Sequence, residues 1–288
     1  MASGLTIRTF KPSELTEMYL AFLDAFSDYE VPFRLSKEQF VRKFVQKLQI
    51  DFSLSVGAFD YDALAGFIFT SVSYYNGKLT AYNGGTGVRP YYRGRKIPAE
   101  MISFLIPRFQ QKHIKRCILE VLVNNNKAIK SYESIGFEKT KLYKCYQLKE
   151  ADFSDFIPQV DLEIFSVKSP NWELYETFLD YPLSFLDSNA MVNANISNET
   201  IIEIHSDYKC VGYVIYQTSF NRISQIGVSK AYRGKGVGKS LINYLVNQLN
   251  GSTLSIVNVD EQVESLNGFL NHLGFQNHLD QYEMELAL

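Results

Sequence analysis

The sequence predicts an α/β protein made of two copies of one domain. A short apolar strand, a glycine-rich turn and an amphipathic helix follow one another between residues 222 and 249. The start of this pattern occurs twice, because VRPYYRG at 88–94 aligns with VSKAYRG at 228–234, 140 residues further on. IGF at 135–137 aligns in the same way with LGF at 273–275, at an offset of 138. These matches indicate an internal repeat, and a length of 288 residues also corresponds to about two domains.

Residues 1–148 form the predicted first domain. Apolar side chains at helical spacing predict helices, and alternating or continuous apolar runs predict strands. Ser36 is expected to cap the second helix and Gly136 to end the last one. The predicted order is strand 5–10, helices 13–29 and 37–48, strands 55–61, 63–73 and 81–88, helix 99–111, strand 117–123, helix 126–135 and strand 141–148.

Residues 160–288 form the predicted second domain, after a polar linker at 149–159 that contains Pro158. One helix is expected between its first two strands, where the first domain has two. The predicted order is strand 161–167, helix 172–186, strands 201–207, 209–218 and 222–228, the helix that ends at 249, strand 253–259, helix 263–273 and strand 280–288. A helix between sequential strands fits a mostly antiparallel sheet with a central parallel pair.

The composition makes several classes of protein unexpected. A hydrophobic fraction of 46% and a charged fraction of 21% are ordinary for a globular chain, and a net charge of −2 argues against a nucleic-acid partner. We find neither the apolar core of a signal peptide nor an apolar run long enough to span a membrane. Cys117, Cys145 and Cys210 have no metal-like spacing, and their odd number fits a reducing cytoplasm better than a disulfide framework. The four histidines are scattered along the chain, so no metal is expected.

The glycine-rich turn at 233–238 predicts a binding site for a phosphorylated cofactor. Its glycines let the backbone approach a ligand closely, and the following helix offers unpaired N–H groups at its positive end. Arg233, Lys235 and Lys239 add positive charge. A P-loop would need a glycine where Arg233 stands, and the three glycines give G-x-G-x-G instead of the dinucleotide pattern G-x-G-x-x-G.

The spacing Arg233-x-x-Gly236-x-Gly238, after a strand that ends at Val228, resembles the acyl-CoA pyrophosphate loop of the GNAT N-acetyltransferase superfamily. The resemblance covers nearly the whole chain and is strongest at 80–148 and 210–275. It implies two tandem GNAT-type domains, each a mixed, mostly antiparallel sheet flanked by helices, and acetyl-CoA as acyl donor. The residues that it places on the cofactor are Val228, Arg233, Gly234, Lys235, Gly236, Val237, Gly238 and Lys239 in the second copy and Val88, Arg93, Gly94 and Arg95 in the first.

The glycine-rich turn of the first copy departs from this pattern. Lys96 and Pro98 stand where the family prefers small residues. Proline is compatible with a helix start, but Pro98 removes one N–H group that would face a phosphate. Arg95 and Lys96 supply positive charge in compensation, and the sequence leaves open whether this copy holds a cofactor.

The catalytic residues that the resemblance implies lie in the first copy, in LEVLVNNNKAIKSYESIGF at 119–137. By this match Glu120 is the general base, Asn125 contacts the pantetheine arm and Tyr132 donates a proton to the departing thiolate. The simpler interpretations are a solvent-facing strand residue, a helix-capping polar turn and a packed helix tyrosine. The corresponding residues of the second copy are Asn258, Val263 and Leu270.

The resemblance therefore implies acetyl transfer from acetyl-CoA to an amine of a small molecule or protein, by direct attack on the thioester. We expect the chemistry in the first half. One alternative is catalysis by the second half with a structural first half, and another is a non-catalytic protein that binds or senses acyl-CoA. Acetyl-CoA and an amine acceptor are the expected partners, and the sequence leaves open the acceptor and whether the protein is a monomer or a homodimer.

Overall fold

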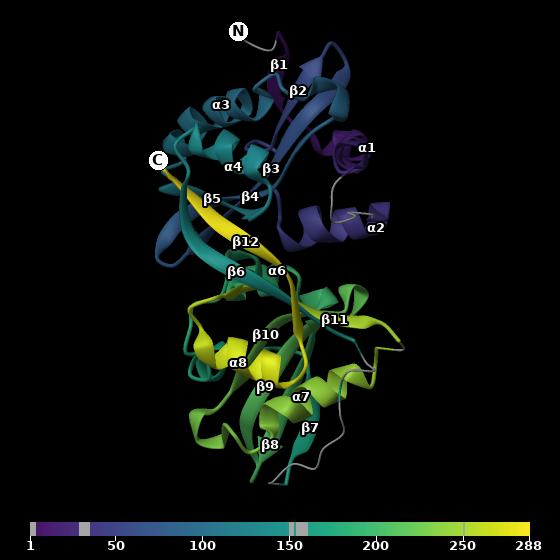
Figure 1. The fold of residues 1–288 in the computed structure, drawn as a ribbon, viewed down its shortest axis with the longest axis vertical. Helices are drawn as coiled ribbons and strands as arrows, with labels where there is room; N and C mark the ends of the chain where they lie inside the picture. Colours follow the sequence, from purple (N-terminus) through teal and green to yellow (C-terminus); the bar gives the residue numbers. More distant parts are fainter. Residues whose placement is uncertain (1–3, 29–34, 150–152, 154–160, 250) are drawn as a thin grey trace. The chain divides into compact units, whose positions relative to one another are not determined.

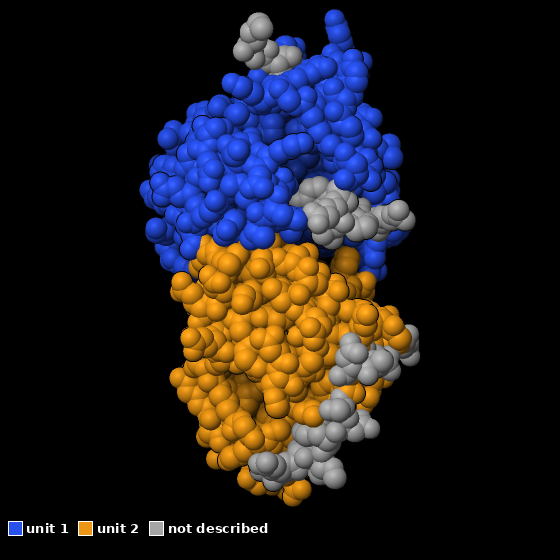
Figure 2. Space-filling view, viewed as in Figure 1, with its two compact units in different colours: residues 1–140, 282–288 blue, residues 141–281 orange. Residues whose placement is uncertain are grey.

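A computed structural model describes residues 4–28, 35–149, 153, 161–249 and 251–288 (Figure 1). The chain divides into two compact units, Met1–Thr140 with Tyr282–Leu288, and Lys141–Gln281 (Figure 2). Only Lys149 and Phe153 of the expected linker 149–159 are among the described residues, so the rest of that prediction lies outside them. Within the described ranges, no helix combines the length and apolar character needed to cross a membrane.

Unit 1 is a mixed sheet with helices on both faces. Its strand order is β1-β2-β3-β4-β5-β12, antiparallel from β1 to β4 and parallel between β4 and β5. The strands are β1 (Thr6–Thr9), β2 (Val56–Asp60), β3 (Ala63–Tyr75), β4 (Lys78–Val88), β5 (Arg116–Leu122) and the end of β12 (Gln276–Ala287). The helices are α1 (Leu15–Ala25), α2 (Lys37–Phe40), which a π-helical segment Val41–Lys47 continues, α3 (Ile97–Gln111) and α4 (Asn126–Glu133).

Unit 2 repeats this architecture. Its strand order is β6-β11-β10-β9-β8-β7, with β10 and β11 parallel and the other pairs antiparallel. The elements are β6 (Glu138–Lys149), β7 (Glu163–Val167), α5 (Trp172–Glu176), α6 (Asn189–Ala194), β8 (Thr200–Ser206), β9 (Lys209–Gln217), β10 (Arg222–Val228), α7 (Val237–Val246), β11 (Thr253–Asp260) and α8 (Glu264–His272). The predicted fold class, two repeated domains with mixed and mostly antiparallel sheets, is confirmed.

Different side chains fill the two faces of the unit 1 sheet. The face under α3 and α4 is mainly aliphatic, with Met101, Leu105 and Ile129 in its buried core. The face under α1 and α2 is aromatic, and there Phe22 on α1 contacts the ring of Phe67 on β3. Figure 1 shows these two helix pairs on opposite sides of the strands. Much of the high aromatic content is therefore core packing.

The two faces of the unit 2 sheet are divided in the same way. Leu241 and Leu245 of α7 and Leu270 of α8 are fully buried on one face. On the other face Tyr175 of α5 stacks on Tyr213 of β9, with ring centroids 3.9 Å apart. The α7–α8 face adjoins the glycine-rich loop, and the α5 face adjoins the β8–β9 hairpin.

The last strand of each sequence half belongs to the other compact unit. From Lys141 onward β6 lies in unit 2 and pairs antiparallel with β11, and Leu148 is fully buried in the unit 2 core. From Tyr282 onward β12 lies in unit 1, where Met284 is fully buried. The units therefore differ from the predicted boundaries 1–148 and 160–288, because the apolar faces of these strands complete the core of the opposite unit.

The prediction of a single helix at 172–186 was wrong. Helix α5 ends at Glu176, and a second helix, α6, begins after Ser188, whose side chain accepts a hydrogen bond from the Met191 N–H. Pro182 lies between them, and a proline both lacks an N–H and disfavours the helical conformation of the residue before it. Unit 2 therefore also has two helices between its first strands.

Candidate active site

In each unit the central parallel strands are joined at one end and diverge at the other. β10 and β11 have two register pairs, at Arg222 and Ile223, and β4 and β5 have three, from Thr80 to Tyr82. Just beyond these pairs, the register of β10 with β9 shifts at Ser224, and the register of β4 with β3 shifts at Gly84, so that each of these residues is an extra residue in its strand. Such bulges bend a strand and increase its twist. The glycine-rich loops therefore follow strands that have turned away from their parallel partners.

The loop after β10 leads directly into the N-terminus of α7. Gly234 and Gly236 adopt φ values of 75° and 94°, a left-handed conformation that disfavours residues with a Cβ atom. The Ser240 N–H donates to the Gly236 carbonyl at 2.9 Å, so the N–H groups of residues 237–239 precede the first intrahelical bond. These N–H groups form the positive end of the helix, where an anion is stabilised.

Arg233 braces the loop. Its guanidinium forms an ion pair with Asp180 and donates to the carbonyl oxygens of Phe178 at 2.8 Å and Val228 at 3.1 Å. The hydrogen bond from Arg233, with that from Lys230, lowers the pKa of Asp180. Because Asp180 balances the charge of Arg233, the cationic character expected at this loop depends on Lys235 and Lys239.

A cavity of about 390 Å³ lies beside this loop within unit 2. Its walls include the predicted cofactor residues Val228, Arg233, Gly234, Gly236, Val237, Gly238 and Lys239. Phe178 and Tyr181 line another side, and α8 contributes Phe269 and His272. The wall thus combines backbone N–H groups and cationic side chains with apolar rings, a surface suited to a ligand with a charged end and an apolar end.

The loop of unit 1 has the same brace. Arg93 forms a two-pronged ion pair with Asp28, with nitrogen–oxygen distances of 2.6 and 2.8 Å. It also donates to the carbonyl oxygens of Val88 at 3.2 Å and Ala25 at 3.0 Å. The repeat seen in the sequence is therefore also a repeat of contacts, since Arg93 and Arg233 occupy equivalent positions.

The unit 1 loop differs at the start of its helix. Lys96 holds the left-handed conformation, with φ of 57°, at the position that Gly236 has in unit 2. That conformation costs a residue with a Cβ atom about 1–2 kcal/mol. Pro98 lies in the first turn of α3 and has no N–H to donate, as the sequence indicated. Arg95 lies over the rings of Tyr91 and Tyr92, at 5.3 and 5.2 Å from their centroids.

Glu120 is hydrogen-bonded within unit 1. It lies on β5, partly buried, and its Oε2 accepts a hydrogen bond of 2.5 Å from the hydroxyl of Tyr82 on β4. Tyr82 is almost fully buried, at 5% exposure, and it lies at the last register pair before the parallel strands diverge. Glu120 is therefore held by a neighbouring strand, and its role as general base stays a prediction.

Asn125 lies at the start of α4 and Tyr132 lies in its last turn. Tyr132 is 9% exposed and its ring makes an edge contact with Phe137, with centroids 5.5 Å apart. Asn125 is the N-cap of α4, and its side-chain oxygen accepts from the Ala128 N–H at 3.2 Å. Packing and capping thus contribute to both positions, as the simpler interpretations expected, and their catalytic roles stay predictions.

Comparison with known proteins identifies the family. Residues 16–137 match the model described as the acetyltransferase (GNAT) family, and residues 174–286 match the acetyltransferase (GNAT) domain. The chain belongs to the GNAT family of acetyltransferases. The two matches cover both sequence halves, so both copies are GNAT domains.

One curated protein and two solved structures show how far this GNAT chain resembles others. A 77-residue segment is 34% identical to N-alpha-acetyltransferase 30 of Saccharomyces cerevisiae, and it covers 27% of this chain and 44% of the yeast protein. A GCN5-related N-acetyltransferase from Sphaerobacter thermophilus has a TM-score of 0.72 at 12% identity, covering 98% of this chain and 95% of that one. A tandem GNAT protein from the clavulanic acid biosynthesis pathway has a TM-score of 0.72 at 11% identity, covering 98% of both chains. These structures show a shared tandem fold.

The second GNAT domain has structural residues at the positions of the predicted catalytic set. Asn258 has a positive φ of 57° and its side-chain oxygen accepts from Gln281 at 3.1 Å. Leu270 is fully buried in the core, and Val263 precedes α8 without a side-chain cap. None of these side chains can transfer a proton to a reacting amine or thiolate.

Three residues of these GNAT sites were missed by sequence reasoning. Asp28 and Asp180 hold the loop arginines, and Tyr82 holds Glu120. The aspartates lie 65 and 53 residues before their arginines, and Tyr82 lies 38 residues before Glu120. A signal was present for Tyr82, since it occupies the strand that leads into the loop, but nothing local indicated its partner.

Proposed function

We propose that this GNAT protein is an acetyl-CoA-dependent N-acetyltransferase that acts on a primary amine, with its chemistry in unit 1. The observation that carries the proposal is that unit 1 combines a braced loop at a helix N-terminus with a carboxylate, Glu120, next to the diverging strands. In unit 2 the equivalent loop borders a cavity, but Asn258 and Leu270 stand at the positions of the predicted base and acid. Unit 2 is therefore proposed to bind acetyl-CoA without turning it over.

The cavity of unit 2 fits the two ends of acetyl-CoA. The N–H groups at the start of α7 are suited to the pyrophosphate, and Lys239 in the cavity wall adds positive charge, while Nζ of Lys235 lies 4.8 Å from the ring centroid of Tyr232. The apolar part of the wall, which includes Phe178 and Phe269, suits the pantetheine arm. The corresponding cofactor residues proposed for unit 1 are Val88, Arg93, Gly94 and Arg95, with Asn125 on the pantetheine.

The proposed step in unit 1 transfers the acetyl group directly. The neutral amine nitrogen attacks the thioester carbonyl carbon, and the carbon–sulfur bond breaks. Glu120 accepts the proton that leaves the amine, and Tyr132 donates a proton to the departing thiolate. The hydroxyl of Tyr82 donates to one carboxylate oxygen of Glu120, which orients the proposed base. No covalent enzyme intermediate forms.

Calorimetric titration of acetyl-CoA into glycine variants tests where the cofactor binds. Gly236→Glu and Gly94→Glu each put a carboxylate and a Cβ atom into a left-handed loop position at which we propose that the cofactor binds. Gly77→Glu is the matched control, because Gly77 is also left-handed, with φ of 72°, and has open space around it in the β3–β4 turn. We expect two sites in the wild type, the loss of one in each loop variant, and no change in the control.

Turnover is measured on the same proteins as thiol release with a panel of amines. The panel includes peptides with free N-termini, because the similar yeast protein is named an N-alpha-acetyltransferase. We expect Gly94→Glu to abolish turnover and Gly236→Glu to retain it. The reverse result would assign catalysis to unit 2 and overturn the proposal for unit 1.

Substitution of Tyr132 tests its role separately from cofactor binding. Tyr132→Phe keeps the ring that packs against Phe137 and removes only the hydroxyl. We expect kcat to fall by about 10²-fold or more, with an unchanged Kd for acetyl-CoA. Unchanged turnover with intact binding would show that Tyr132 is not the acid.

Binding without turnover is the second candidate function, and the mismatch between the two units favours it. The cavity lies in unit 2, whereas the predicted acid Tyr132 and base Glu120 lie in unit 1. This function predicts acetyl-CoA binding that Gly236→Glu abolishes, with no acetyl transfer to any amine of the panel. Measurable transfer by the wild type would exclude it.

A further inference from the structure

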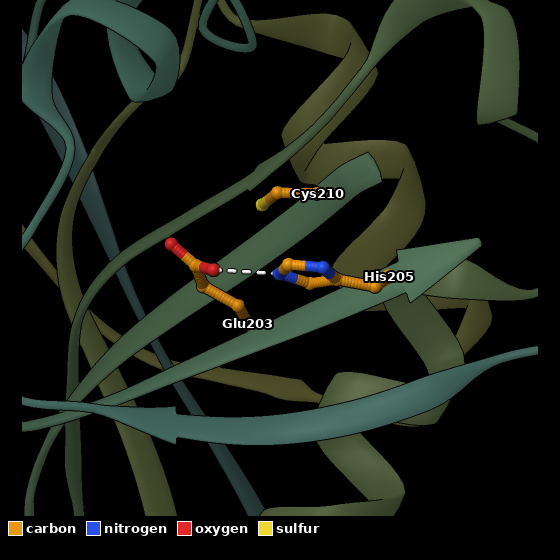
Figure 3. Close-up of side chains that lie close together, drawn as sticks. All are labelled: Glu203, His205 and Cys210. Carbon is orange, nitrogen blue, oxygen red and sulfur yellow. Dashed lines mark hydrogen bonds and ion pairs between the residues drawn. The ribbon is translucent and has the colours of Figure 1, made fainter. Parts of the chain in front are cut away.

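Three side chains with metal-binding atoms meet on one face of the β8–β9 hairpin (Figure 3). Glu203 and His205 are two residues apart on β8 and so leave the same face of the strand. Cys210 on β9 is the register partner of His205. Asp207 and Tyr208 between them both have positive φ, as a type I′ turn requires, and this tight turn fixes the register. One atom each of the carboxylate, imidazole and thiol lie within 4.8 Å of one another.

Helix α5 and the sheet support the carboxylate of this cluster. The Tyr175 hydroxyl donates to Oε1 of Glu203 at 2.5 Å, and burial, with this hydrogen bond, raises the pKa of Tyr175 so that it stays a donor. The Tyr175 ring is fixed by stacking on Tyr213. The other carboxylate oxygen, Oε2, lies 2.7 Å from Nε2 of His205. Metal-binding carboxylates are commonly oriented by such outer hydrogen bonds.

We propose that Glu203, His205 and Cys210 bind a divalent ion of the zinc type, with a fourth position open to water. Thiolate and imidazole together select zinc among the common divalent ions, whereas magnesium and calcium require oxygen ligands. The cluster is reachable, since the side chains of His205 and Glu203 are 23% and 12% exposed. Three protein ligands with an open position form a recognised zinc arrangement.

Small side-chain movements suffice to close the site. Bond lengths of about 2.0–2.3 Å in a tetrahedral arrangement put the ligand atoms roughly 3.3–3.6 Å apart. The ligand atoms, all within 4.8 Å of one another, therefore need to approach by at most about 1.5 Å, and Nε2 of His205 and Oε2 of Glu203, now 2.7 Å apart, need to separate by roughly 0.6–0.9 Å. Rotation of the Cys210 and His205 side chains is the movement that we propose, because the hairpin register holds the two residues opposite each other.

Binding changes the protonation of two ligands. The metal replaces the contact between Nε2 of His205 and Oε2 of Glu203, and the ring nitrogen that binds it must carry no proton. Burial, with the nearby charge of Glu203, raises the pKa of the Cys210 thiol, whereas a metal binds sulfur as the thiolate. The metal therefore binds the thiolate, and one proton per ion leaves to solvent.

Cobalt titration of the full-length chain, dialysed against a chelator, tests the proposal. We expect one equivalent of Co²⁺ to produce a sulfur-to-cobalt absorption band in the near ultraviolet and visible bands of tetrahedral cobalt, and Zn²⁺ to displace it. Cys210→Ser is expected to lose the ultraviolet band, and His205→Gln to weaken binding at least about tenfold. Cys117→Ser is the matched control, because Cys117 lies in the unit 1 core and is expected to keep the band.

Tyr175→Phe separates support of the ligand from folding. It keeps the ring stacked on Tyr213 and removes only the hydroxyl bond to Glu203. We expect the Kd for Co²⁺ to rise about 10–100-fold in the folded variant. Absence of the ultraviolet band in the wild type, or its persistence in Cys210→Ser, would overturn the proposal and leave Tyr175, Glu203 and His205 as a hydrogen-bonded network only.

Discussion

The contact between Gly238 and Phe269 predicts a stability effect that depends on one neighbour. A Cβ atom added at Gly238 would lie 2.9 Å from two ring carbons of Phe269 on α8, closer than side chains normally approach. In the first copy Pro98 stands at the position of Gly238, and Ser131, with no ring, stands at that of Phe269. We therefore predict that Gly238→Ala destabilises unit 2 in the wild type but not in a Phe269→Ser background.

The magnitude follows from two opposing effects. Overpacking of a buried contact costs about 1–3 kcal/mol, whereas replacing glycine by alanine in a helix stabilises by about 0.5–1 kcal/mol. With Phe269 present, Gly238→Ala is expected to lower the free energy of unfolding by up to about 2.5 kcal/mol. With Phe269→Ser the ring is absent, so the same substitution is expected to be neutral or to stabilise by up to about 1 kcal/mol.

Urea unfolding followed by tryptophan fluorescence measures this effect in unit 2. Trp172 is the single tryptophan of the chain, and it lies on α5 in unit 2. The four proteins of the double-mutant cycle give a coupling free energy, expected at about 1–3 kcal/mol. Equal destabilisation by Gly238→Ala in both backgrounds would refute the contact with Phe269 as the cause and would point to the loop conformation instead.

Three further predictions concern other contacts. Asp180→Asn removes the ion pair that holds Arg233 and is expected to weaken acetyl-CoA binding to unit 2 about tenfold. The pKa of Asp180 is lowered from 3.8, so in the wild type this ion pair persists above pH 3.8 and is lost as the pH falls through the lowered pKa. Titration of acetyl-CoA binding against pH checks this. Tyr82→Phe removes the donor to Glu120, so kcat is expected to fall about tenfold or more with an unchanged Kd for acetyl-CoA, and equal turnover would contradict the role of Glu120. Met284→Ala in β12 leaves a cavity in the unit 1 core and is expected to lower the free energy of unfolding by about 2–5 kcal/mol, with faster hydrogen exchange in β5 and not in β9. Faster hydrogen exchange in β9 instead would contradict the assignment of the end of β12 to unit 1.

Features that depend on neighbouring residues could be predicted from the sequence. The repeat and the order of most helices and strands follow from hydrophobic periodicity, which is a local property. The two loops were predicted for the same reason, since Gly234 and Gly236 mark the left-handed positions that lead into a helix. The family resemblance rests on the same short segments, and the GNAT matches over both halves agree with it.

Contacts between residues far apart in the chain were decided only by the tertiary structure. The partner of Glu120 and the aspartates of both loop arginines lie between 38 and 65 residues from them. The cluster of Glu203, His205 and Cys210 was missed because its spacing matches no metal motif, although an antiparallel register places His205 opposite Cys210.

Strands β6 and β12 show why some features could be predicted from the sequence and others only from the tertiary structure. Alternating side chains predicted that β6 and β12 are strands, because that pattern is set by each residue and its neighbours. The same pattern fits any sheet with a free edge and an apolar face, so it cannot specify which sheet the strand joins. That choice depends on burial of side chains such as Leu148 and Met284 against residues of the other half, and only the folded chain brings them together.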